Sequence, residues 1–166
     1  MNRGFSLYEL LVVIAILVIL LSIIIGSFSS SRERTRDDAR IAQLQTMSLA
    51  LQEYHTICKS YPAELDATSS SDCGTTLFSA FVSSDELTDI MDKIGTGEMY
   101  YAPLTGSASG SAPCYYYHAG VTLENTGRKI LAEDDDYDSK RGSLGLCSVT
   151  RGDFDGADPI FDIKQP

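Results

Sequence analysis

The sequence predicts an α+β protein: a long N-terminal helix followed by a small antiparallel β-sheet. Three observations support this fold class. An apolar run from Leu10 to Ile25, interrupted only by Ser22, is too long for a strand and suits a helix. Apolar residues then recur at three- and four-residue spacing from Ile41 to Tyr54, as on one face of a continuing helix. The second half of the chain contains short tyrosine-rich segments separated by Gly/Ser-rich loops, which is typical of antiparallel strands.

The first helix is predicted over residues 5–28 and is apolar on every face. A helix of this kind must be buried in lipid or in protein, and about 20 apolar residues suffice to span a bilayer. We therefore expect residues 5–28 to form a membrane-spanning helix. A cleaved secretory signal peptide and a simple signal anchor are alternatives, although an acid at the head of the apolar run fits neither well.

That acid is Glu9, and an ionised carboxylate in apolar surroundings needs a partner. Arg3 is six positions away and lies off the interacting helix face. If the chain were cut between Gly4 and Phe5, the new amine of Phe5 would lie one helical turn from Glu9, on the same chain or on a neighbour. Alternatively, Glu9 lies at headgroup depth, where the helix N-terminus favours an acid.

The N-terminal residues resemble the signature of type IV pilins and of the pseudopilins of type II secretion. The matching stretch is Gly4-Phe5-Ser6-Leu7-Tyr8-Glu9-Leu10-Leu11-Val12-Val13-Ile14-Ala15. The family pattern is a glycine, a phenylalanine that becomes the first mature residue, a glutamate five residues into the mature chain, and an unbroken apolar helix. The leader is short, with one basic residue, and Gly26 lies near the place where many true pilins carry a proline.

The resemblance implies cleavage after Gly4 by a prepilin peptidase, N-methylation of Phe5, and assembly of a helical filament through Phe5 and Glu9. It also implies that the sheet packs on the second half of the long helix. The implied partners are other copies of the chain, an inner-membrane assembly platform and its ATPase. Major pilin, minor pilin and secretion pseudopilin remain open.

On this basis the chain divides into a leader (1–4), a transmembrane and polymerisation helix (5–28) and an extracytoplasmic domain (29–166). The domain is expected to contain the helix continuation (29–58), a loop region with short helices (59–97), the β-sheet (98–133) and an acidic loop region (134–166). Its predicted strands are Glu98–Ala102, Cys114–Ala119 with an extension through Leu123, and Arg128–Ala132.

We expect a single-pass inner-membrane protein with its N-terminus inside, which then enters an extracellular or periplasmic filament. The arginines conflict with this orientation, because Arg32, Arg34, Arg36 and Arg40 follow the span and only Arg3 precedes it. The resemblance and the cysteines favour export of the domain.

The chain has four cysteines, Cys58, Cys73, Cys114 and Cys147, and no Cys-x-x-Cys pair, which argues against zinc. An even number in an exported domain predicts two disulfides. Three connectivities exist, and the shortest loops favour Cys58–Cys73 with Cys114–Cys147.

The acidic composition limits the function classes. A net charge of −10 argues against nucleic acid as a partner of the bulk surface. Asp153, Asp155 and Asp158 are candidate calcium ligands, with a solvated acidic surface as the alternative, and they do not fit EF-hand spacing. No other cofactor is expected. Neither His55 nor His118 has a nucleophile motif beside it, so we expect a protein that is not an enzyme.

The favoured function is a structural subunit of a type IV pilus or pseudopilus filament. The alternative is a signal-anchored extracellular binding domain that does not polymerise. Glu9 discriminates between them, because a simple anchor does not need an acid in its apolar segment.

Overall fold

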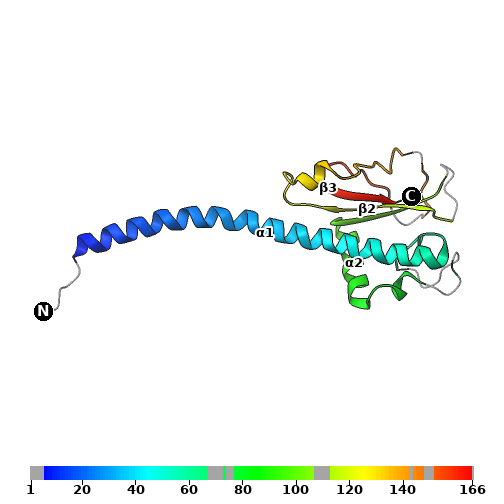
Figure 1. The fold of residues 1–166 in the computed structure, drawn as a ribbon, viewed down its shortest axis with the longest axis horizontal. Coiled ribbons are helices and arrows are strands. Elements are labelled where there is room, and N and C mark those ends of the chain that lie inside the picture. Colours follow the sequence, from blue (N-terminus) through cyan, green and yellow to red (C-terminus); the bar gives the residue numbers. More distant parts are fainter. Residues whose placement is uncertain are drawn as a thin grey trace.

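The computed structural model describes residues 6–66, 73, 77–106, 113–142, 144–147 and 152–165, and within the long helix it leaves the side chains of residues 23–29 undescribed. The α+β class is confirmed. A single helix extends far beyond the rest of the molecule, and the sheet and the second α-helix gather around its C-terminal half (Figure 1). The elements in chain order are α1 (Leu7–Cys58), the 3-10 helix η1 (Phe78–Ala80), α2 (Ser84–Thr96), β1 (Met99–Leu104), β2 (Tyr116–Thr122), the 3-10 helix η2 (Lys129–Ala132) and β3 (Ile160–Gln165).

Helix α1 has 52 residues, which corresponds to about 80 Å at the usual rise per residue. It begins after the N-cap Ser6 and ends before Lys59, whose left-handed backbone lets its N–H donate to His55 O at 2.8 Å. Only the second half of α1 buries one of its faces against the rest of the chain. Its buried side chains form the centre of the core: Ile41, Leu44, Met47, Leu51 and Tyr54.

The sheet is antiparallel and has the order β1-β2-β3, with β2 in the centre. Alternation along β2 gives the two faces different neighbours. Tyr117 and Ala119 belong to the core cluster that includes the α1 residues, and Ser48 of α1 hydrogen-bonds the Tyr117 hydroxyl at 2.8 Å. Burial raises the pKa of Tyr117 to about 12. On the opposite face, His118 stacks on Phe154 at 3.8 Å between ring centroids.

Both outer edges of the sheet are hydrogen-bonded by other parts of the chain. Along β3, the N–H groups of Asp162 and Lys164 donate to carboxylate oxygens of Asp134 and Asp135, at 3.1 and 2.9 Å. Along β1, Cys147 N–H donates to Pro103 O at 3.0 Å, and Thr105 N–H donates to Gly145 O at 2.7 Å. The acidic run after η2 therefore covers one edge of the sheet.

One predicted strand is wrong and one real strand was not predicted. Residues 128–132 were expected as the third strand, but Lys129–Ala132 form η2. The third strand is β3, inside the region expected to be an acidic loop (134–166). The position beside β2 is taken by β3 because its Phe161 and Ile163 add apolar side chains to the core, whereas the run at η2 buries only Leu131.

Helix α2 lies in the region that was expected to be a loop with short helices (59–97), and it has 13 residues. Its N-cap is Ser83, which forms a capping box with Glu86. The helix ends at Gly97, whose positive φ of 76° is a conformation that glycine adopts without strain.

Candidate functional site

The N-terminal end of α1 contains Glu9, the residue on which the sequence-based function depends. Tyr8 N–H donates to the Ser6 hydroxyl at 3.3 Å, and Ser6 N–H donates to Glu9 Oε2 at 3.0 Å. Ser6 and Glu9 thus form a capping box that satisfies N–H groups at the start of the helix. No ion pair to Glu9 is present among the described residues. Gly4 and Phe5, the predicted cleavage and methylation positions, lie outside them.

The N-terminal half of α1 extends away from the rest of the chain (Figure 1), and the apolar side chains of residues 7–21 are exposed. Their exposed fractions run from 37% at Val12 to 87% at Leu7. A helix that is apolar on all faces requires burial, and a contiguous exposed apolar surface of this size marks an interaction site. The isolated chain does not provide that burial, so the partner must come from outside it.

No helical stretch within the described residues combines the length and apolar character needed for a bilayer crossing.

Where α1 enters the domain, its arginine-rich segment binds the loop that follows β2. Arg36 and Arg40 both form ion pairs with Glu124, and the hydrogen bond from Arg36 lowers the pKa of Glu124. Asp37 is fully buried and accepts the N–H groups of Glu124 and Asn125 at 2.8 and 3.1 Å. This network fixes the loop after β2 on α1, the same continuous helix that contains the exposed apolar segment.

The first predicted cysteine pair is present as a disulfide between Cys58 and Cys73, which ties the end of α1 to the following loop. The second predicted pair, Cys114–Cys147, is not joined in this structure. The two backbones are held by different neighbours: Tyr61 N–H donates to Cys114 O at 2.7 Å, whereas Cys147 lies against Pro103.

Replacing Cys58 and Cys73 together by serine is expected to lower the free energy of unfolding by about 3 kcal/mol, because the bond closes a loop of this length in the unfolded chain. Urea unfolding of the detergent-solubilised chain, followed by tyrosine fluorescence, measures the loss. Cys147→Ser is the control and should change stability little. A comparable loss in that control under non-reducing conditions would show that Cys147 is disulfide-bonded in solution.

The candidate calcium ligands do not converge. Asp155 Oδ1 accepts the N–H of Ala157 at 3.2 Å, and the backbone of Asp155 bridges to Asp138. Within the described ranges, no group of three or more acidic, histidine or cysteine side chains is placed to hold a metal ion. Calcium binding by Asp153, Asp155 and Asp158 stays a prediction.

The acidic region instead contains a buried pair that sequence reasoning missed. His118 Nε2 and Asp162 Oδ2 are 2.6 Å apart, and both side chains have 0% exposure. Asp162 also accepts the N–H groups of Asp136 and Tyr137, each at 3.0 Å. Burial, with the nearby charge of Asp162, raises the pKa of Asp134 to about 6.

The pair has the composition of an acid–base dyad but no access to a substrate. His118 is enclosed by Phe154 and Tyr137, whose ring centroids lie at 3.8 and 5.1 Å. The geometry therefore suits a structural role, in which the pair holds β2, β3 and the acidic segment before β3 together. Neither residue belongs to a local motif, and the two are separated by 44 positions in the chain.

The comparisons with known proteins address the N-terminal segment. Residues 1–25 match the family model described as the prokaryotic N-terminal methylation motif. No curated protein and no solved structure matches the chain significantly. The match includes Gly4, Phe5 and Glu9 and stops before the amphipathic half of α1. The first 25 residues of this chain are thus a prokaryotic N-terminal methylation motif, the signature of type IV pilins and pseudopilins.

Proposed function

We propose that the protein is a structural subunit of a type IV pilus or pseudopilus filament, polymerised through the N-terminal half of α1. The observation that carries the proposal is the exposed apolar half-helix that begins near Glu9 and is continuous with the helix in the folded domain. The methylation motif supports it, because that motif implies prepilin peptidase processing and filament assembly in general. A motif of this type also points to a structural protein rather than an enzyme.

Before assembly, the subunit would be held in the inner membrane by the apolar half of α1, with its N-terminus inside and its domain outside. Prepilin peptidase would cut after Gly4 and leave Phe5 as a methylated N-terminus. An assembly platform driven by its ATPase would then transfer the subunit into the filament. There, apolar α1 surfaces of neighbouring copies replace the lipid as the surroundings of this helix.

Glu9 would have two successive partners in this scheme. In the isolated chain its carboxylate caps α1 by accepting Ser6 N–H. In the filament it would pair with the α-amine of Phe5 on an adjoining copy. Because apolar helices slide past one another with little preference, this repeated charge pair would fix the axial register of the subunits.

The processing step is tested on protein from membranes of the native host. N-terminal sequencing and intact mass are expected to show a chain that begins at Phe5 and carries one added methyl group. A start at Met1, or after Ser29, would contradict the proposal. Electron microscopy of surface or periplasmic fractions tests polymerisation, and a chain found only as a membrane-bound monomer would favour an anchored binding domain.

A further inference from the structure

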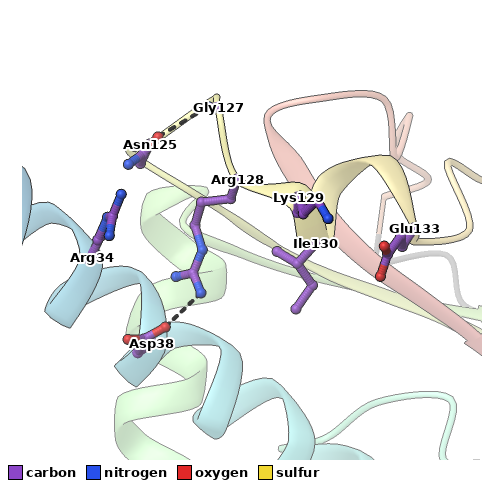
Figure 2. Close-up of a pocket in the computed structure, with 8 residues that line it drawn as sticks. All are labelled: Arg34, Asp38, Asn125, Gly127, Arg128, Lys129, Ile130 and Glu133. Carbon is purple, nitrogen blue, oxygen red and sulfur yellow. Dashed lines mark hydrogen bonds and ion pairs between the residues drawn. The ribbon is translucent and has the colours of Figure 1, made fainter.

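A pocket of about 640 Å³ lies between α1 and the segment that follows β2. Figure 2 shows Arg34 and Asp38 on α1 facing Asn125, Arg128 and Ile130. The remaining lining residues are Gly127, Lys129 and Glu133. The pocket lies where the domain adjoins the extended part of α1, because Arg34 and Asp38 come from the N-terminal end of the amphipathic half.

The pocket has a surplus of positive charge in a chain whose net charge is −10. It is lined by three basic side chains and two acidic ones. Arg128 pairs with Asp38 at 2.7 Å, but its Nη1 is buried without a hydrogen-bond acceptor among the described residues. Arg34 and Lys129 form no ion pair with any of the residues that the structure describes. These groups offer an anionic ligand at least one unsatisfied donor and two unpaired cations.

A complementary surface lies further along the same helix. Leu49, Glu53 and Ile57 follow one another at four-residue spacing and therefore share one face of α1. Leu49 and Ile57 are 66% and 58% exposed, although the helix around them is otherwise amphipathic. Glu53 is exposed, and its carboxylate has no partner among the described residues. We call these three residues the α1 ridge.

The pocket and the ridge of one molecule cannot meet. Asp38 and Glu53 are separated by 15 positions on a continuous helix, which places them about 22 Å apart along its axis. Contact is only available between two molecules. A surface that binds a different surface on the next copy makes a head-to-tail contact, and such contacts generate an open helical filament unless the rotation closes into a ring.

We propose that the pocket binds the α1 ridge of a second copy of this chain, with the Glu53 carboxylate between Arg34, Arg128 and Lys129. This inference rests on the proposed filament function and assigns a contact to the domains within it. The half-buried Ile130 also lines the pocket, and it would contact the apolar residues Leu49 or Ile57 that flank Glu53 on the ridge. Asp38 and Glu133 at the same pocket disfavour a uniformly anionic surface such as a membrane, whereas a single carboxylate fits between the cations.

A zero-length cross-link tests the contact on the unmodified protein. Carbodiimide treatment of purified filaments is expected to join Lys129 to Glu53, and mass spectrometry of the digest identifies the joined peptides. The same treatment of detergent-solubilised monomer should not give this product, because the two side chains are too far apart within one chain. Filaments that lack the Lys129–Glu53 product would overturn the proposal.

Charge reversal tests the contact energetically. Arg34→Glu combined with Lys129→Glu is expected to reduce filament yield about tenfold or more, since like charges that face each other across an interface repel. Glu53→Lys alone should do the same, and combining all three changes should restore assembly. Lys140→Glu combined with Arg141→Glu is the matched control for the double reversal, and Asp92→Lys is the control for Glu53→Lys, because they make the same charge changes on exposed residues outside the pocket and the ridge.

The outcomes separate this inference from the function on which it rests. If the unchanged chain never forms filaments, the proposed function fails and the inference fails with it. If the unchanged chain assembles and the reversed variants assemble equally well, only the inference is overturned. A loss that Glu53→Lys does not rescue also overturns it and makes anionic lipid the better ligand for the pocket. Circular dichroism of each variant monomer verifies that the fold is retained.

Discussion

Glu9→Leu is expected to accumulate as a membrane-bound monomer and to form almost no filaments. Inside a bundle of apolar helices, the Phe5 amine of a neighbour would be left without its counter-charge, and breaking a buried pair typically costs about 3–5 kcal/mol. Glu9→Gln should also assemble poorly because it lacks the charge. Filament yield in sheared fractions, measured against total membrane-bound subunit by immunoblot, gives the result.

The capping box allows the two roles of Glu9 to be separated. A glutamine at this helix position still accepts the N–H of Ser6 in a capping box, so Glu9→Gln removes the charge and keeps the cap. Ser6→Ala is the matched control, since it removes the capping hydroxyl and keeps the charge. Normal assembly of Glu9→Gln together with failure of Ser6→Ala would make capping the essential role and contradict the charge pair.

Asp162→Ala is expected to lower the free energy of unfolding by about 3–5 kcal/mol, the largest stability loss that we expect from one substitution in the domain. It would leave the fully buried His118 Nε2, and the partly buried N–H groups of Asp136 and Tyr137, without their acceptor. Urea unfolding of the detergent-solubilised chain measures the change.

Asp92→Ala serves as the control for that experiment, because Asp92 is an exposed acid on α2 and its loss should change stability by less than about 0.5 kcal/mol. Asp162→Asn should fall between the two, since its amide keeps one acceptor oxygen. If Asp162→Ala lowered the free energy of unfolding no more than Asp92→Ala does, the buried His118–Asp162 pair would not stabilise the domain.

The elements set by local patterns were predictable from the sequence. The apolar run and the three- and four-residue spacing from Ile41 to Tyr54 are contained in one helix, so α1 was expected with nearly its true end at Cys58. The β1 and β2 segments were expected from their tyrosine-rich runs. Their true bounds differ by a few residues, which is normal for element ends.

The elements that depend on distant partners were not predictable. Strand β3 alternates apolar and polar residues over too few positions to stand out in an acidic region, and its place is decided by pairing with β2. In the sequence, Asp37 is one more charge in an arginine-rich segment, yet it is fully buried because it accepts two N–H groups more than 80 positions away. The His118–Asp162 pair was missed for the same reason.

The covered edges of the sheet have a consequence for the way in which copies of this protein can associate. An open strand edge invites another chain to add a strand, which leads to uncontrolled aggregation. Here Asp134 and Asp135 occupy N–H groups along β3, and residues 145–147 occupy positions along β1. Main-chain pairing between neighbouring domains is thereby hindered along β3 and at the C-terminal end of β1. A dense array of these domains is therefore expected to be held together mainly by helix packing and side-chain contacts, which would leave each domain a separate folded unit that can be withdrawn from the array intact.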